Sequence, residues 1–315
     1  MSLFTSPAGK QELLDWYERF HARVQSPTER RLVQTRFGDT HVLIGGPEGA
    51  PNVVLLHGAL ASSAHLLGEL QGLLTRFRVH AVDVIGQSVK SADAQPSPKT
   101  DDYGHWLAEV MDGLSLKRAA VVGVSWGGFA ALRFAAVAPA RVERLVLLVP
   151  AGLVNGPLWA GFSKVFWPMM RYRRKPTPEN LAAATKHLLT THDDDWTPYL
   201  GTAMTAFTSK MTIPKLARPE EFSGFTAPVL VIGADGDLSF PGEAVVARVR
   251  ALFRGPVETE LLKDVRHSPP TTEPFRAWMA ERLTRFLTAD GQGTAGAAPG
   301  ATGGSTGARA TGTGF

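Results

Sequence analysis

Short apolar runs rich in β-branched residues alternate with segments of helical length along most of the chain. This alternation predicts an α/β fold with a mostly parallel sheet and helices on both faces, because strands buried on both faces form continuous apolar runs. Eight strands are predicted, at residues 31–37, 40–44, 52–56, 79–84, 119–124, 145–149, 229–232 and 257–262. Helices are predicted at residues 11–24, 62–75, 102–114, 127–138, 242–253 and 273–287. The first two strands are expected to form an antiparallel hairpin.

The alternation stops between residues 151 and 217, where six prolines interrupt helical stretches. An inserted helical cap explains this change, and it would lie over the carboxyl ends of the strands, where open α/β sheets bind ligands. We therefore expect an α/β core at residues 1–150 and 218–288, with the cap at residues 151–217. Residues 289–315 are mainly Gly, Ala and Thr, and this tail is expected to be disordered because it cannot bury enough apolar surface.

The composition excludes several kinds of chemistry. The 315-residue chain has no cysteine, which rules out disulfides, thiolate metal sites and a cysteine nucleophile. Its formal net charge of +4 is small for this length, so nucleic-acid binding is not expected. His192 precedes three aspartates but has no second ligand group at a recognisable spacing, so no metal and no other cofactor is predicted.

Two segments bear on location and partners. Residues 1–10 lack a charged stretch followed by an apolar run, so neither a secretion signal nor a membrane span is predicted, and a cytoplasmic protein is expected. The cluster Arg171-Tyr172-Arg173-Arg174-Lys175 carries four positive charges and is interpreted as a solvated loop face, with an anionic partner or a membrane surface as the alternative. The expected partner is a small molecule, and the oligomeric state is left open.

The segment most suggestive of catalysis is Gly123-Val124-Ser125-Trp126-Gly127, because it follows an apolar run and leads into a predicted helix. A strand, a sharp turn and a helix place the serine at the tip, and the flanking glycines let the turn close tightly. That arrangement is typical of an activated nucleophile. The plainer interpretation is a Gly-rich turn that only ends a strand, since G-x-S-x-G also occurs by chance.

A serine hydroxyl is a poor nucleophile at neutral pH, so a hydrolase needs a base, an acid that orients the base, and donors for the developing oxyanion. Asp237 follows the strand predicted at residues 229–232, and His267 follows the strand predicted at residues 257–262. Both therefore lie just past the carboxyl ends of strands, beside the serine in a parallel sheet. The chain order Ser125, Asp237, His267 is the order that α/β-hydrolases use.

At this point the sequence resembles the α/β-hydrolase superfamily, and specifically its capped esterase-like members, over about residues 30–288. The resemblance rests on five motifs in the family's order: Leu55-Leu56-His57-Gly58, Asp83-Val84-Ile85-Gly86 with Ser91 downstream, Gly123-Val124-Ser125-Trp126-Gly127-Gly128, Asp237-Leu238-Ser239-Phe240-Pro241, and a late His267. It implies that Ser125 is the nucleophile, His267 the general base and acid, and Asp237 the residue that orients His267.

The resemblance also implies the oxyanion donors. The turn His57-Gly58-Ala59 resembles the family's oxyanion loop, which implies the backbone N–H groups of Ala59 and Trp126 as donors. The acid departs from the family's spacing, because Asp235 and Asp237 lie two and four residues after a strand-ending glycine, whereas the family usually places one acid three residues after it. Asp237 is favoured, since it keeps the family's Asp-x-x-x-Pro spacing, and Asp235 stays the alternative.

The cap carries a wide apolar face. Trp159, Phe162 and Phe166 of this face, together with Leu60 beside the oxyanion loop, are the candidate substrate-binding residues. An apolar lid predicts an apolar acyl or alcohol group in the substrate.

These observations predict a cofactor-independent serine hydrolase that cleaves a small or medium carboxylic ester through an acyl-enzyme. The same triad serves the hydrolysis of carbon–carbon bonds, lactones and amides, which stay as alternatives. The fold also hosts non-catalytic receptors for small ligands. Haloalkane dehalogenation is disfavoured, because that chemistry needs a carboxylate at the position of Ser125.

Overall fold

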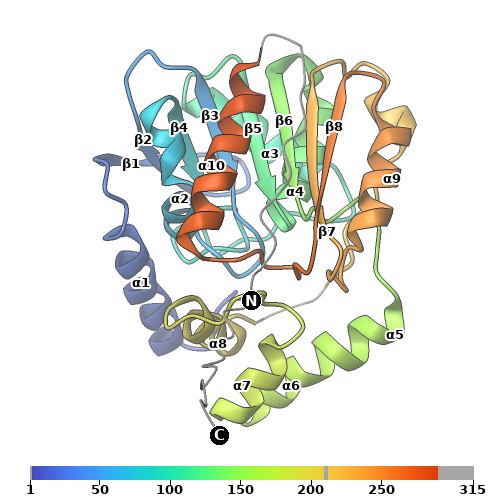
Figure 1. The fold of residues 1–315 in the computed structure, drawn as a ribbon. Coiled ribbons are helices and arrows are strands. Elements are labelled where there is room, and N and C mark those ends of the chain that lie inside the picture. Colours follow the sequence, from blue (N-terminus) through green and yellow to red (C-terminus); the bar gives the residue numbers. More distant parts are fainter. Residues whose placement is uncertain (1, 209–211, 290–315) are drawn as a thin grey trace, which may run out of the picture.

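The computed structural model describes residues 2–208 and 212–289, and one eight-stranded sheet runs through their centre (Figure 1). The strands are β1 (Thr28–Val33), β2 (Thr40–Gly45), β3 (Asn52–Leu56), β4 (Arg78–Val82), β5 (Ala119–Val124), β6 (Val142–Leu148), β7 (Val229–Ala234) and β8 (Val257–Leu262). Their order across the sheet is β1-β2-β4-β3-β5-β6-β7-β8. β2 pairs antiparallel with β1 and β4, and the other neighbouring pairs are parallel. The predicted α/β fold with a mostly parallel, eight-stranded sheet is confirmed.

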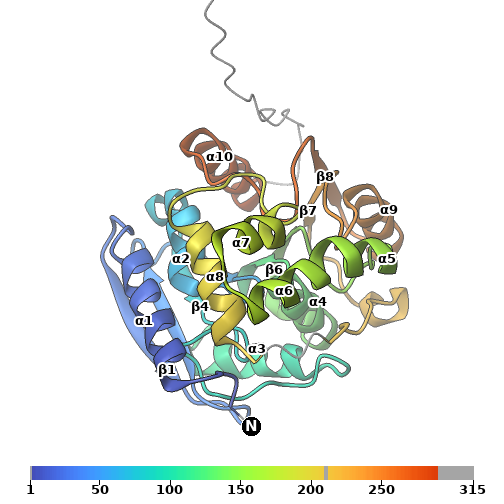
Figure 2. The same ribbon diagram turned by 90° about the horizontal axis from the view of Figure 1, so that it is seen from below.

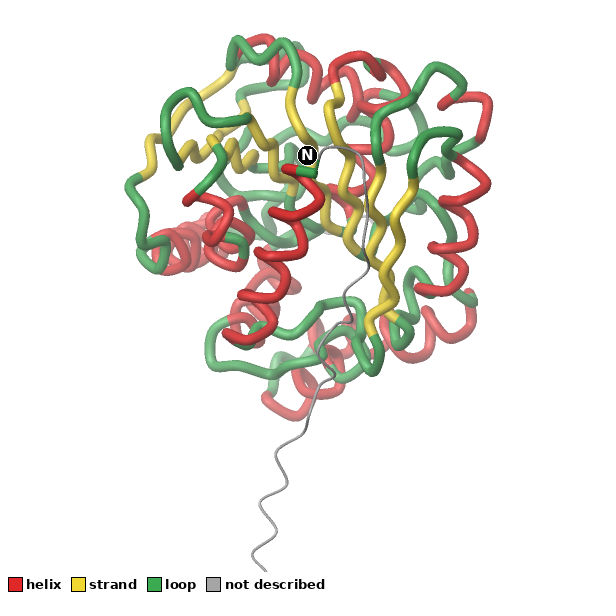
Figure 3. Tube along the Cα trace, turned by 45° about the horizontal axis from the view of Figure 1, so that its top comes forward, coloured by secondary structure: helices red, strands yellow, loops and turns green. Residues whose placement is uncertain are grey.

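Helices cover both faces of the sheet (Figure 3). One face packs against α1 (Pro7–His21), α2 (Ser63–Glu69) and α10 (Glu273–Thr288), and the other against α3 (Asp102–Gly113), α4 (Trp126–Val137) and α9 (Gly242–Leu252). Short 3₁₀ turns η1 (Gln71–Thr75), η2 (Pro139–Arg141) and η4 (Pro219–Phe222) complete this part of the chain. Along β3, Val53 and Leu55 join one apolar core while Val54 and Leu56 join the other. Burial on both sides is why the central strands are apolar at consecutive positions.

Residues 151–217, which we call the cap segment, leave the sheet after β6 and return before β7. The segment contains α5 (Leu158–Gly161), the π-helix η3 (Phe162–Phe166), α6 (Trp167–Arg174), α7 (Pro178–Thr185) and α8 (Trp196–Ala206). These helices lie across the end of the sheet from which the loops after β5 and β8 emerge (Figures 1 and 2). The division of the chain into a core and a cap domain stays a prediction.

The basic cluster lies in a helix and not in the loop that the sequence suggested, since its arginines belong to α6. Arg173 donates hydrogen bonds to the carbonyl oxygens of Met204 and Phe207, at 2.6 and 2.9 Å. This side chain is therefore used to join two helices of the cap segment, α6 and α8, instead of facing water alone.

Helix α1 lies beside α2 of the core and α8 of the cap segment (Figures 1 and 2). Ser6 caps its first turn. Phe20 on its buried face packs edge-on against Tyr199 of α8, with the ring centroids 5.2 Å apart. On its exposed side, Arg19 pairs with Asp195, directly before α8. The amphipathic pattern of α1 thus has two partners, because its apolar stripe meets both the core and the cap segment.

The bounds of several predicted elements differ from those observed, most clearly for two helices and the first strand. The first strand spans Thr28–Val33 and not residues 31–37, because pairing with β2 sets Thr28 opposite Gly45. The single helix predicted at residues 62–75 is interrupted at Leu70, where α2 ends before η1. The first helix begins at Pro7 and ends at His21, so it lies earlier than predicted.

The tail predicted to be disordered, residues 289–315, lies outside the described residues except for Ala289. Among the described helices, none combines the length and the apolar character needed to cross a membrane.

Candidate active site

Ser125 lies between β5 and α4, at the tip of a sharp turn. Its backbone has φ 51° and ψ −111°, a positive-φ conformation that L residues rarely adopt. A Cβ atom on Gly123 would lie 2.4 Å from the carbonyl oxygen of Gly127, and one on Gly127 would lie 2.1 Å from the carbonyl oxygen of Leu56. Only glycine fits at both positions, so the G-x-S-x-G pattern is what lets β3, β5 and α4 approach one another this closely.

Three side chains from separate loops form a hydrogen-bonded chain at this turn. Ser125 Oγ lies 2.9 Å from His267 Nε2, and His267 Nδ1 lies 2.7 Å from Asp237 Oδ2. Because an ionised carboxylate can only accept, Nδ1 is the donor to Asp237. In the neutral ring, Nε2 is then free to accept the proton of the serine hydroxyl.

The environment of His267 raises the pKa of its imidazole. Burial lowers the pKa of His267, but the charge of Asp237 and its hydrogen bond outweigh burial and leave the pKa raised above its usual value. The other carboxylate oxygen of Asp237 accepts the backbone N–H groups of Ser239 and Phe240, at 2.7 and 3.0 Å. With both oxygens occupied, the carboxylate is fixed in its orientation toward His267.

The structure brings Asp237, and not Asp235, to His267. The Asp237 side chain is fully buried. The Asp235 carboxylate instead lies 3.8 Å from Lys263 Nζ, and the Lys263 side chain is 65% exposed. The two aspartates therefore have different surroundings although only one residue separates them.

The loop after β3 carries one of the two backbone donors expected beside Ser125. Ala59 and Trp126 line the same cavity as Ser125 and His267. Trp126 opens α4, so its N–H group has no partner within that helix. Ala59 makes no hydrogen bond to the residues that the structure describes. Neither N–H group therefore has a hydrogen-bond partner in the described part of the chain, as the proposed donors require.

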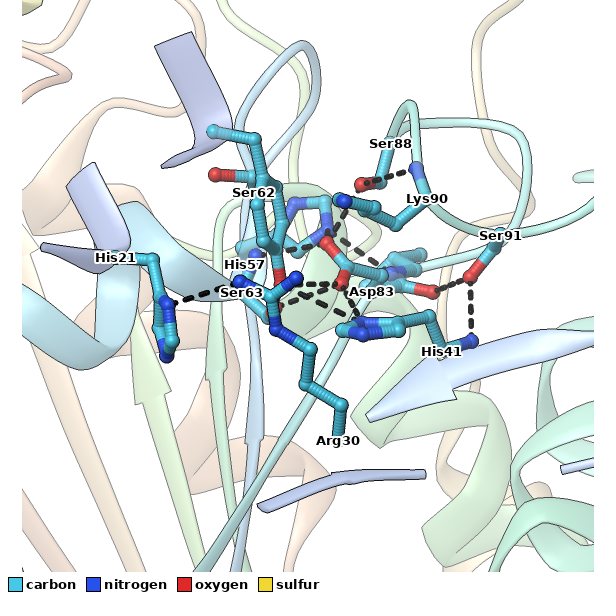
Figure 4. Close-up of polar contacts among 12 residues, drawn as sticks. His21, Arg30, His41, His57, Ser62, Ser63, Asp83, Ser88, Lys90 and Ser91 are labelled. Atoms are coloured by element: carbon cyan, nitrogen blue, oxygen red, sulfur yellow. Dashed lines mark hydrogen bonds and ion pairs between the residues drawn. The ribbon is translucent and has the colours of Figure 1, made fainter. Parts of the chain in front are cut away.

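A buried polar network anchors this loop at both ends (Figure 4). At its start, His57 accepts the N–H of Val84 at Nε2, 2.9 Å away, and donates from Nδ1 to the carbonyl oxygen of Gly58, 2.7 Å away. Burial lowers the pKa of His57 more than Asp83 raises it, which favours the neutral ring that this pattern requires. At its end, Ser63 donates its backbone N–H and its hydroxyl to Asp83, at 2.9 and 2.7 Å.

Asp83 is the centre of this network and is fully buried. Its carboxylate also accepts from Ser88 Oγ at 2.6 Å, His41 Nδ1 at 2.8 Å and the Tyr17 hydroxyl at 3.1 Å. Burial alone would raise the pKa of Asp83, but these hydrogen bonds and the neighbouring histidines lower it to about 2. From the sequence, Asp83 was predicted only as part of a family motif, without a partner. Its position directly after a buried strand was the signal available.

A cavity of about 840 Å³ opens beside Ser125, between the core and the cap segment. Three of the predicted substrate-binding residues, Leu60, Phe162 and Phe166, line it. Trp159 differs from the prediction, because it is 78% exposed and is not among the described residues that line the cavity. Its ring instead stacks on that of Phe162, with the centroids 6.1 Å apart.

Several lining residues were not singled out from the sequence, because the inward face of an apolar helix cannot be identified before its packing partner is known. They are Leu66, Leu70, Leu188, Leu189, Leu200 and Met204. His65 also lines the cavity, and its ring stacks on that of Trp196 with the ring centroids 3.8 Å apart.

Comparison with known proteins assigns the class. Residues 51–274 match the family described as alpha/beta hydrolase fold, and the chain belongs to that family. It is 27% identical over 271 residues to Carboxylesterase YbfK of Bacillus subtilis (strain 168), covering 82% of this chain and 88% of that protein. It is 28% identical over 264 residues to the Uncharacterized carboxylesterase nap of the same strain, and this match covers 82% of this chain and 86% of that protein. The solved structure of naproxen esterase (carboxylesterase NP) from Bacillus subtilis matches with a TM-score of 0.75 at 23% identity, covering 88% of this chain and 97% of that one.

The Asp83 network leads to a prediction about stability. Asp83→Asn places an amide N–H₂ among groups that donate to the carboxylate, so we expect the free energy of unfolding at pH 7 to fall by about 1–3 kcal/mol. Because the folded pKa is depressed from 3.8 to about 2, the stabilisation is present above pH 4 and is lost as the pH falls toward 2. In urea unfolding at several pH values, the difference in the free energy of unfolding between the parent and Asp83→Asn should therefore become smaller between pH 4 and pH 2. Asp264→Asn, at an exposed turn, serves as the control. A difference that stays constant over this range would contradict the assignment.

Proposed function

We propose that this protein is a serine hydrolase that cleaves a small or medium carboxylic ester through an acyl-enzyme. Hydrolysis of a carboxylic ester is supported by the similarity to carboxylesterases over 82% of the chain. The observation that carries the serine mechanism is the hydrogen-bonded chain from Ser125 through His267 to Asp237, at 2.9 and 2.7 Å. The cytoplasmic location expected from the sequence remains a prediction.

In the proposed reaction, Ser125 Oγ attacks the ester carbonyl carbon while His267 Nε2 takes the hydroxyl proton. Asp237 stabilises the imidazolium that forms, in agreement with the raised pKa of His267. The backbone N–H groups of Ala59 and Trp126 donate to the oxyanion. His267 then gives its proton to the leaving alcohol, which departs as the carbonyl re-forms. A water molecule repeats these steps on the acyl-enzyme and releases the acid and the free serine.

The cavity supports an apolar acyl or alcohol group in the ester. The cap segment contributes Phe162, Phe166 and Met169 to its wall, and α10 contributes Phe275 and Met279. Burying the apolar part of a substrate against these side chains would contribute roughly 25 cal/mol for each Å² removed from water. We propose that the cap segment selects substrates in this way.

The nucleophile can be tested directly. Ser125→Ala should lower kcat by on the order of 10³-fold or more, because the remaining residues cannot form the acyl-enzyme. A fluorophosphonate probe should label the parent protein with one equivalent per chain and should leave the variant unlabelled, with peptide mapping to locate the adduct. Stoichiometric labelling at another residue would overturn the assignment. Melting curves of both proteins show whether the fold is retained.

The pair of aspartates offers a matched test of the acid. Asp237→Asn removes the charge that stabilises the imidazolium and should cost up to about 10⁴-fold in kcat. Because Asp237 raises the pKa of His267, the acid limb of the kcat/KM profile of the residual activity should move to lower pH. Asp235→Asn should cost far less, since Asp235 pairs only loosely with Lys263. A larger loss in Asp235→Asn than in Asp237→Asn would contradict the proposed triad.

The wall of the cavity should set the acyl-chain preference. Phe166→Ala enlarges the cavity, so relative kcat/KM should shift toward bulkier acyl groups, with discrimination changing by roughly 1–3 kcal/mol between neighbouring chain lengths. Trp159→Ala removes a similar amount of aromatic surface outside the cavity and should leave the profile unchanged. The measurement is kcat/KM over a series of p-nitrophenyl esters. Equal shifts in both variants would argue against this wall as the selector.

A further inference from the structure

The cap segment holds the loop that carries His267. Leu189 forms a parallel bridge with Ser268, the residue directly after His267. The N–H of Ser268 donates to the carbonyl oxygen of Leu188 at 2.8 Å, and the N–H of Thr190 donates to the carbonyl oxygen of Ser268 at 3.1 Å. A short piece of the cap segment therefore pairs with the backbone beside His267 as a strand would.

One hydroxyl joins both neighbours of His267. Thr190 Oγ1 donates to the carbonyl oxygen of Ser268 and accepts the backbone N–H of Arg266, each at 2.8 Å. The Arg266 guanidinium adds a hydrogen bond to the carbonyl oxygen of Leu189, also at 2.8 Å. Thr190 thus fixes the backbone on the two sides of His267 from a segment that is far away in sequence.

The hydrogen bonds from the cap segment act on the loop whose position determines where the His267 ring lies. His267 lies in the loop between β8, which ends at Leu262, and α10, which begins at Glu273. Its ring contacts Ser125 on one side and Asp237 on the other, at 2.9 and 2.7 Å, so a small shift of the loop lengthens at least one of these contacts. A misplacement of about 1 Å in such a group can cost 10²-fold in rate.

We propose that Thr190 is a positioning residue for His267, so that the cap segment completes the triad as well as covering it. The inference rests on the proposed function. Thr190 is not among the described residues that line the cavity, so its effect is expected on kcat and not on substrate binding. A purely structural role would change the melting temperature and leave the kcat of the folded protein unchanged.

The test compares three variants of the full chain with an activated ester as substrate. Thr190→Val keeps the size and shape of the side chain but removes both hydrogen bonds of the hydroxyl, and should lower kcat by about 10- to 100-fold with KM changed less than about twofold. Thr190→Ser restores the hydroxyl and should recover most of the activity. Thr191→Val is the matched control, because the Thr191 side chain makes no hydrogen bond to the described part of the chain. The kcat of this control variant should equal that of the parent protein.

The rate of inactivation by a fluorophosphonate probe gives a second readout, since it reports the reactivity of Ser125 without turnover. It should fall with kcat in Thr190→Val and recover in Thr190→Ser. Should Thr190→Val fail to fold, Arg266→Met removes only the bond to the Leu189 carbonyl oxygen and should lower kcat by about fivefold.

An unchanged kcat in folded Thr190→Val, a change in KM alone, or a serine variant as slow as the valine variant would overturn the inference. An unchanged kcat in Arg266→Met would also overturn the inference. These results differ from failure of the proposed function, in which the parent protein hydrolyses no ester or Ser125→Ala keeps its activity.

Discussion

Parallel pairing of the central strands is the constraint on which the site depends. Because these strands run in one direction, the loops that follow them leave from the same edge of the sheet. The register keeps the strand ends level, with Leu56 of β3 opposite Gly123 of β5, and Leu148 of β6 opposite Ile232 of β7. Side chains far apart in sequence can therefore meet without any loop crossing the core. Each of the groups proposed for the reaction stands on one of these loops or at the start of the helix that follows it.

The sheet brings the groups near one another, and two separate polar supports set their final positions. On the core side, the network around Asp83 and His57 holds the loop that carries the Ala59 N–H. On the cap side, Thr190 holds the loop that carries His267. The first support is fully buried and charged at its centre, so it is expensive to disturb. The second joins the neutral hydrogen bonds of Thr190 to backbone groups, each of which contributes modestly to stability, with one charged hydrogen bond from Arg266 to the Leu189 carbonyl oxygen.

The sequence predicted those features of the fold and the site that depend on short local patterns of residues. Apolar runs and glycine spacing predicted the sheet and the turn at Ser125, and they placed Asp237 and His267 after their strands. Each of these features is encoded by a few neighbouring residues and depends little on packing. The choice between Asp235 and Asp237 came from a resemblance in spacing, and the contact with His267 is made by Asp237. Trp159 was wrongly predicted to line the substrate site, because the sequence of a helix with apolar residues on several sides does not show which side faces inward. Thr190 gave no signal at all, because its partners are 76 and 78 residues later in the chain.

The position of α1 has a consequence for how the chain reaches its folded state. Tyr17 donates to Asp83, 66 residues later, and Thr5 donates to the carbonyl oxygen of Ala206 across a still longer separation. During synthesis α1 is made before either partner exists, and it cannot bury its whole apolar stripe until β4 has formed and α8 has been synthesised. Contacts of such long sequence separation carry a large loop-closure cost, so α1 is expected to dock late. Until then Tyr17 and Phe20 stay exposed to water, so the undocked helix adds apolar surface that favours aggregation of the nascent chain.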